Sequence, residues 1–161
     1  MMAFLRRLFA RGEPVLSEAG PRDAAAIAVL HAKSFHRGWS DGDIESMLLD
    51  RAVLAHRAML GGSLVGFILS RVILDEAEIL SVAVSTPHRG KSLARRLLDL
   101  HLRRLAGLGA RAVFLEVDED NVPAGRLYGR AGFREVARRD TYYRNPGGKA
   151  TAALVLRRGL P

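Results

Sequence analysis

The sequence predicts a mixed α/β domain of the α+β class, built around one central sheet. Alternating apolar segments in the first half of the chain predict antiparallel strands, and Gly61-Gly62 supplies a tight turn between two of them. Residues 80–98 instead combine a strand, a turn and a helix, and another apolar strand follows at 112–117. Hairpins followed by a strand–helix–strand unit indicate a sheet that is mixed but mostly antiparallel.

Each element of this fold has its own local signal. In chain order, we expect strands at 15–19, 52–60, 64–74, 78–84, 112–117, 133–139 and 152–157, helices at 21–35, 41–49, 91–107 and 121–131, and a loop at 141–148. Pro21 is tolerated in the first turn of a helix, and Ser40 or Asp41 can cap the second helix. Asn121 is a good N-cap for the last helix, and the glycines at 107 and 109 suit the end of the third.

The length of 161 residues predicts one domain that is large enough to bury a core. No linker, repeat or low-complexity tract divides the chain, so we expect residues 15–161 to form that domain. Residues 1–14 are interpreted as an N-terminal extension. Two roles stay open for it: packing on the domain, or a weak basic amphipathic contact with a membrane or a partner.

Composition narrows the possible partners. The sequence has no cysteine, which excludes disulfides and cysteine nucleophiles and is compatible with a cytoplasmic protein. The net charge of +8 suits an anionic partner, such as a phosphorylated cofactor, nucleic acid or a ribosome surface. Aromatic residues make up only 6% of the chain, so we expect no direct role in nucleic-acid binding. No apolar stretch approaches the roughly 18 residues of a membrane span.

Residues 80–98 (LSVAVSTPHRGKSLARRLL) predict a site for an anion. A buried strand end at 80–84 leads into a turn with Pro87 and Gly90, and an amphipathic helix begins at Lys91. The first turn of a helix presents free backbone N–H groups and the positive end of the helix dipole, and basic side chains add charge here. A basic loop at a helix start is also common as a solvated surface, and the residues alone leave both interpretations open.

Two further residues could take part in chemistry. Glu116 stands late in an apolar strand, where a carboxylate is either solvated at the end of the sheet or placed in a site that can raise its pKa. Tyr128 stands in the last predicted helix, where a tyrosine usually packs in the core with its hydroxyl hydrogen-bonded. The histidines have no metal-binding spacing, so we expect no metal site.

Four blocks of sequence resemble the GNAT superfamily of N-acetyltransferases, and within it the bacterial enzymes that acetylate an N-terminal alanine of ribosomal proteins. The blocks are VILDEAEILSVAV (72–84), PHRGKSLARRLL (87–98), LEVDEDN (115–121) and LYGRAGF (127–133), with Tyr142-Tyr143 beyond them. The resemblance runs from about residue 16 to residue 156. It implies the GNAT fold, with about seven strands and four flanking helices, and acetyl-CoA as the acetyl donor.

The resemblance assigns most cofactor contacts to one loop. The pyrophosphate of acetyl-CoA would bind the loop and first helical turn that comprise Arg89, Gly90, Lys91, Ser92, Leu93, Ala94 and Arg95. Val82, Ala83 and Val84 would offer backbone groups to the pantetheine arm, which lies along the strand like an added strand, and Asn121 would hydrogen-bond the cofactor. The chain departs from the family pattern at Ser92, where the family has a glycine. Because serine is small and can donate to a phosphate, we expect binding to survive.

The resemblance also implies the chemistry. Glu116 matches the family's general base, which removes a proton from the acceptor amine, and Tyr128 matches the general acid, which protonates the leaving thiolate. A protein N-terminus would bind between the loop at 36–40, around Trp39, and the segment at 140–145, with Tyr142 and Tyr143. The acidic residues at 118–120 could attract a basic peptide or be simply solvated.

Three functions therefore stay under consideration. The leading one is acetylation of a ribosomal protein that begins with alanine. The second is acetylation of a small amine, a lysine or other N-termini by an enzyme of the same fold. The third is a non-catalytic ribosome- or RNA-associated protein, against which the presence of Glu116 and Tyr128 argues.

Overall fold

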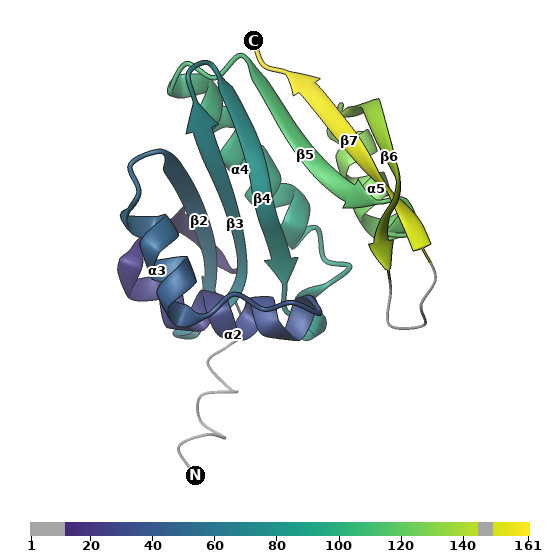
Figure 1. Cartoon of the computed structure of the whole chain (residues 1–161). Coiled ribbons are helices and arrows are strands. Elements are labelled where there is room, and N and C mark those ends of the chain that lie inside the picture. Colours follow the sequence, from purple (N-terminus) through teal and green to yellow (C-terminus); the bar gives the residue numbers. More distant parts are fainter. Residues whose placement is uncertain (1–11, 145–149) are drawn as a thin grey trace.

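The computed structural model describes residues 12–144 and 150–161, in which one sheet separates two layers of helices (Figure 1). The sheet has seven strands in the order β1-β2-β3-β4-β5-β7-β6. The strands are β1 Val15–Glu18, β2 Val53–Leu60, β3 Ser63–Ile73, β4 Glu76–Val84, β5 Ala112–Asp118, β6 Arg134–Arg144 and β7 Ala150–Gly159. Neighbouring strands are antiparallel except β4 and β5, which are parallel. The predicted mixed and mostly antiparallel sheet is thus confirmed.

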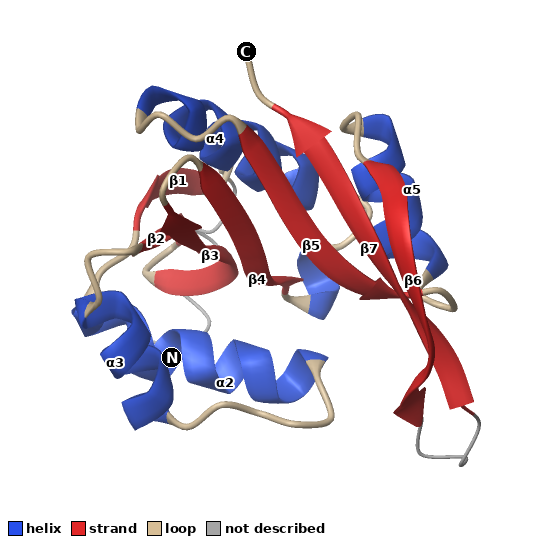
Figure 2. Ribbon diagram, turned by 45° about the horizontal axis from the view of Figure 1, so that its top comes forward, coloured by secondary structure: helices blue, strands red, loops and turns tan. Residues whose placement is uncertain are grey.

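Two helices cover each face of the sheet. They are α2 Ala24–Ser34, α3 Asp41–Leu49, α4 Leu93–Gly107 and α5 Val122–Arg130. The pair α2 and α3 lies over one face of β2, β3 and β4, whereas α4 and α5 lie on the opposite face (Figures 1 and 2). No helix within residues 12–144 and 150–161 is long and apolar enough to cross a membrane.

Helix starts follow the capping signals of the sequence. The side chain of Ser40 accepts a hydrogen bond from the backbone N–H of Asp43, and the Asp43 carboxylate accepts one from the N–H of Ser40. This reciprocal capping box satisfies two N–H groups that the helix itself leaves unpaired. Asn121 caps α5, because its side-chain oxygen accepts from the N–H of Ala124 at 3.2 Å.

Three boundaries differ from the prediction. The first helix begins as a short 3₁₀ turn at Pro21–Asp23. Helix α4 begins at Leu93 rather than Lys91, because Ser92 adopts a left-handed conformation that a helix cannot include. Residues 141–144 continue strand β6 where a loop was expected, since β6 extends its pairing with β7 to Arg144. Most of the predicted N-terminal extension, residues 1–11, lies outside the described residues.

Two apolar clusters fill the space between the sheet and its helices. The larger lies under α4 and α5, and α4 contributes one face of buried side chains: Leu93, Leu97, Leu98, His101, Leu102 and Leu105. Gly66 of β3 permits this packing, because a Cβ atom there would lie 3.0 Å from Cδ1 of Leu97. The smaller cluster packs α2 and α3 on the other face of the sheet around Phe67 and Leu69.

A buried pair of histidines lies in the larger cluster, between the sheet and α4. Nδ1 of His56 on β2 lies 2.8 Å from Nδ1 of His101 on α4, so one ring donates and the other accepts. Nε2 of His101 lies 2.6 Å from Oγ of Ser70 on β3. Burial, with a smaller contribution from the neighbouring His56, lowers the pKa of His101 to about 3, and burial also lowers the pKa of His56. Both rings are therefore neutral at physiological pH.

Candidate active site

The sheet divides between β4 and β5. These parallel strands pair at four positions that end with Ile79 opposite Leu115, after which they diverge (Figure 1). The divergence follows a β-bulge in β4, because Leu69 pairs with Ser81 and Ser70 with Ile79, which leaves Leu80 as the extra residue. A bulge bends its strand and increases the local twist, so β4 turns away from β5 beyond this point.

A cavity of about 540 Å³ occupies the division. Its walls come from the end of α2, from β4, from β5 and from α5: Ser34, Phe35, His36, Ile79, Leu80, Ser81, Val82, Leu115, Glu116, Val117, Asp118, Asp120, Asn121, Ala124 and Tyr128. A second cavity of about 400 Å³, lined by Arg51, Leu74 and Arg104 among others, contains none of the predicted site residues.

Glu116 and Tyr128 approach the larger cavity from opposite faces of the sheet. Side chains alternate along β5, and Leu115 and Val117 point into the core under α4 and α5, so Glu116 points to the side of α2. Tyr128 comes from α5 on the other side. The structure thus brings together the two residues that the sequence singled out for proton transfer, one on each side of the divided sheet.

The surroundings of these two residues differ. The Glu116 side chain is 27% exposed, and its Oε1 lies 3.1 Å from Nη1 of Arg139 on β6. Tyr128 is only 7% exposed, and its ring packs edge-to-face on Phe133 with a centroid distance of 5.5 Å. Burial raises the pKa of Tyr128 to about 12, so its hydroxyl keeps its proton at neutral pH.

Within the described residues, the backbone edge of β4 that faces the division has no strand partner beyond Ile79. On its other edge β4 stays paired with β3 as far as Val84. Within residues 80–84, the backbone groups that point toward β5 are not paired with that strand, because β5 has already diverged. The carbonyl of Val84 accepts from Nε of Arg89 instead. Val82, Ala83 and Val84 lie in this stretch, and Val82 lines the cavity. The arrangement fits an extended, amide-containing chain that pairs with β4 as an extra strand.

The turn after β4 fits an anionic group. Gly90 has φ 74° and Ser92 has φ 63°, and α4 follows directly. The side chain of Ser92 makes no capping hydrogen bond. The first helical hydrogen bond runs from the N–H of Arg96 to Ser92 O, so the N–H groups of Leu93 and Ala94 have no helical acceptor. Such an uncapped N-terminus binds phosphate through its N–H groups and its dipole.

The basic side chains of this turn have different surroundings. Nε of Arg89 donates to the carbonyl of Val84 at 2.9 Å, which ties the turn to the end of β4. Arg95 forms an ion pair with Asp99 one helical turn later, at 2.9 Å. Lys91 is exposed.

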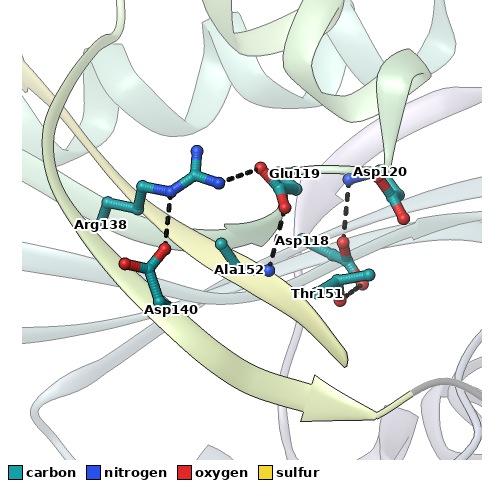
Figure 3. Close-up of polar contacts among 7 residues, drawn as sticks. All are labelled: Asp118, Glu119, Asp120, Arg138, Asp140, Thr151 and Ala152. Carbon is teal, nitrogen blue, oxygen red and sulfur yellow. Dashed lines mark hydrogen bonds and ion pairs between the residues drawn. The ribbon is translucent and has the colours of Figure 1, made fainter. Parts of the chain in front are cut away.

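An acidic turn between β5 and α5 borders the cavity. Figure 3 shows its polar contacts. Asp118 accepts hydrogen bonds from the N–H of Asp120 and the hydroxyl of Thr151, each at 2.9 Å. Glu119 accepts from the N–H of Ala152 at 3.2 Å and pairs with Arg138 at 2.6 Å. These two carboxylates therefore tie the turn to β6 and β7, and through the turn they position Asn121, which lines the cavity and caps α5.

Of the residues predicted to bind the acceptor, Trp39 packs away from the cavity. The ring of Trp39 stacks on His31 at 4.3 Å and packs against the cluster under α2, and Trp39 does not line the cavity. Tyr142 and Tyr143 lie in strand β6, and their side chains lie outside the described part of the structure.

Sequence reasoning missed several residues that do line the cavity or contact its residues. Phe35 reaches it from the end of α2, Ser81 lines it from β4, and Arg139 contacts Glu116. Among these, only Ser81 carried a local signal, since it is a polar residue inside an apolar strand. His36 also lines the cavity, and it belongs to the predicted acceptor loop. Within the described part of the chain, no three His, Asp or Glu side chains gather as a metal site would require.

Comparisons with known proteins identify the family. The family model described as "Acetyltransferase (GNAT) family" matches residues 24–133. The [Ribosomal protein bS18]-alanine N-acetyltransferase of Haemophilus influenzae is 30% identical over 118 residues, which cover 73% of this chain and 80% of that protein. The crystal structure of the ribosomal-protein-S18-alanine N-acetyltransferase from Escherichia coli superposes with a TM-score of 0.85 and 25% identity, covering 91% of this chain and 94% of the other. Arabidopsis thaliana NAA60, solved in complex with acetyl-CoA, shares the fold at a TM-score of 0.81 and 19% identity, over 91% of this chain and 98% of that one. The chain therefore belongs to the GNAT family and is an N-acetyltransferase.

Proposed function

We propose that this enzyme transfers the acetyl group of acetyl-CoA to the α-amino group of a protein N-terminus, and that its acceptor is a ribosomal protein that begins with alanine. The main support is that Glu116 and Tyr128 line one cavity from opposite sides of the divided sheet. The relatives from Haemophilus influenzae and Escherichia coli are alanine N-acetyltransferases of a ribosomal protein, which supports the choice of acceptor.

Acetyl-CoA supplies an acetyl group that is activated as a thioester, on a long arm that ends in phosphates. In this proposal the N–H groups of Leu93 and Ala94 and the turn from Gly90 to Ser92 hold the pyrophosphate, with Lys91 adding positive charge. The unpaired edge of β4 at 82–84 hydrogen-bonds the arm, and the side chain of Asn121 adds a further contact.

Glu116 prepares the acceptor for attack. An α-amino group has a pKa of about 8, so at neutral pH it is mostly an ammonium ion that cannot attack a carbonyl. The Glu116 carboxylate takes one proton, directly or through a water molecule, and the freed lone pair forms the new C–N bond. Because Glu116 points to the side of α2, the acceptor enters from that side, past Phe35 and His36.

The opposite wall completes the transfer. Unpaired N–H groups of β4 can donate hydrogen bonds where negative charge develops on the carbonyl oxygen. As the C–S bond breaks, Tyr128 gives its proton to the sulfur. The nitrogen then loses its second proton to solvent and becomes the amide, Tyr128 regains a proton from solvent, and the proton held by Glu116 returns to solvent, so that one proton is released in total. A pKa of about 12 keeps the Tyr128 hydroxyl protonated until that step.

We expect the enzyme to act in the cytoplasm, where acetyl-CoA and ribosomal proteins are available. The absence of cysteine from the sequence is compatible with a reducing compartment.

A panel of acceptors tests the function. The purified protein is incubated with acetyl-CoA and peptides that begin with alanine, serine or methionine, with an N-terminally blocked peptide that contains lysine, and with a small polyamine. Mass spectrometry then locates the acetyl group. We expect acetylation of the α-amine of the alanine peptide. Transfer only to the lysine peptide or the polyamine would mean that the acceptor is not a protein N-terminus. If the enzyme acetylates none of these acceptors, the proposed function is wrong.

The variant Glu116→Gln tests the proton-transfer role. We expect kcat to fall by about 100-fold or more, since general-base catalysis contributes on that order. The Kd of acetyl-CoA should stay nearly unchanged, because Glu116 points to the acceptor side of the cavity. Glu135→Gln, at an exposed residue of β6, is the matched control and should keep full activity. Unchanged turnover of Glu116→Gln across pH 6 to 9 would exclude Glu116 as the base.

A further inference from the structure

Ser81 holds a buried hydroxyl without a partner. The residue is 7% exposed, and within the described residues its Oγ is the one buried side-chain oxygen or nitrogen that makes no hydrogen bond. A buried hydroxyl that makes no hydrogen bond destabilises the fold, so folded proteins contain few of them and each calls for an explanation. Ser81 also lines the cavity between β4 and β5. A ligand in the cavity is therefore the natural partner for this hydroxyl.

The register of the strands places Ser81 on the same side of the sheet as Glu116. Ser81 lies opposite Leu69 of β3, and Leu69 packs under α2, so Ser81 also points to the side of α2. Glu116 points to that side from β5. The last pair between the two strands is Ile79 with Leu115, so Ser81 and Glu116 follow this pair by two residues and one residue. Both therefore lie on the α2 side of the sheet at the start of the division, and both line the cavity.

This position fits the amine of the acceptor. Once a carboxylate has taken one proton from an ammonium group, the nitrogen has one lone pair for attack and two N–H groups. A hydroxyl oxygen can accept a hydrogen bond from one N–H and leave the lone pair free. Serine is neutral at physiological pH, so it does not compete with Glu116 for the proton. The hydroxyl can also turn about χ1 between staggered positions without movement of the strand.

We infer that Ser81 binds the α-amino group of the acceptor: its Oγ accepts a hydrogen bond from the nitrogen and holds it beside Glu116 for attack. This inference rests on the proposed function, and it adds a second contact for the amine on the acceptor side of the cavity. The bulge at Leu80 contributes directly, because it turns both Leu80 and Ser81 toward α2 and so brings a polar side chain to this wall.

The variant Ser81→Ala tests the inference with the full-length protein and an alanine-initiated peptide. We expect kcat/KM for the peptide to fall about tenfold, while KM for acetyl-CoA stays unchanged. We also expect an unfolding temperature equal to or above that of the wild type, since the substitution removes an unpaired hydroxyl. Ser46→Ala is the control, because Ser46 is an exposed serine of α3 that does not line the cavity. It should keep the wild-type kcat/KM.

The outcomes separate this inference from the proposed function. If the wild type acetylates the peptide and Ser81→Ala does so equally well, the inference is wrong and the proposed function stands. A variant that loses activity together with thermal stability would show a structural role instead. A rise in KM for acetyl-CoA alone would mean that Ser81 contacts acetyl-CoA and not the acceptor amine, and the inference would be wrong. If the wild type acetylates no N-terminus, both proposals fail together.

Discussion

Ser92 has φ 63° and ψ 12°, a left-handed conformation in which glycine is most stable. It stands where the resemblance to the GNAT family places a glycine, directly before α4. The backbone of this turn therefore follows a glycine-like path although the residue is a serine. A side chain with a Cβ atom in this region costs roughly 1–2 kcal/mol, which is the strain that the turn holds.

Replacement of Ser92 by glycine should relieve this strain. We expect Ser92→Gly to raise the free energy of unfolding by about 0.5–1 kcal/mol. Glycine removes the strain of the left-handed conformation from the folded state, but it loses more chain entropy on folding, which offsets part of the gain. The Kd of acetyl-CoA should change by no more than a few-fold, since the backbone path is already in place. Denaturant unfolding and isothermal titration measure the two quantities.

The neighbouring residue supplies the control for this change. Lys91 is not among the described residues with positive φ, so Lys91→Gly adds flexibility without relieving strain and should destabilise the protein. A lower stability of Ser92→Gly than of the wild type would mean that the serine side chain stabilises the turn in a way its conformation does not reveal.

At the scale of elements, the sequence predicted those parts that depend on neighbouring residues. The cap at Ser40, the cap at Asn121 and the turn at Gly61-Gly62 all follow from short-range chemistry, and each begins or joins an element as expected. The continuation of β6 beyond Asp140 could not be predicted, because it depends on pairing with β7 rather than on a local signal. The same holds for the bulge at Leu80, which is defined only by the register between β3 and β4.

Helix α5 offers a test that separates capping from cofactor binding. The side-chain oxygen of Asn121 accepts from the N–H of Ala124, while its amide nitrogen is proposed to reach acetyl-CoA. Asn121→Ser keeps a capping oxygen but removes the amide donor. We expect its stability to stay within a few tenths of a kcal/mol and its Kd for acetyl-CoA to rise about fivefold. Asn121→Ala should lose about 1 kcal/mol of stability as well. If Asn121→Ser binds acetyl-CoA as tightly as the wild type, Asn121 only caps α5 and does not contact the cofactor.

At the scale of the whole molecule, the site depends on the division of the sheet. The sequence and its resemblance to the family singled out Glu116 and Tyr128, but their approach from opposite faces follows from the strand order and from the placement of α5. The contact of Arg139 with Glu116 and the position of Ser81 could not be predicted from the sequence either, because each depends on how separate strands lie beside one another. Long-range pairing determines which candidate residues share a cavity, and one sequence does not reveal it.

The buried histidine pair links the stability of the whole molecule to pH. His101 has a pKa of about 3 in the folded protein and an ordinary value of 6.5 when unfolded. Below pH 6.5 the unfolded chain therefore takes up a proton that the folded protein does not, and this stabilises the unfolded state. We expect the free energy of unfolding to fall as the pH decreases from 6.5 toward 3, with His101 alone contributing about 1.4 kcal/mol per pH unit in the middle of that range.

Denaturant unfolding at a series of pH values between 7 and 4 measures this slope. The double variant His56→Gln/His101→Gln is the matched control, since two amides can still hydrogen-bond across the core but do not titrate. Its absolute stability is expected to be lower, because glutamine does not reproduce the shape of a packed imidazole. Its dependence on pH should nevertheless be shallower than that of the wild type by at least the contribution of His101. Equal slopes for the two proteins would mean that the pair does not stay neutral in the fold, and that carboxylates elsewhere determine the acid sensitivity.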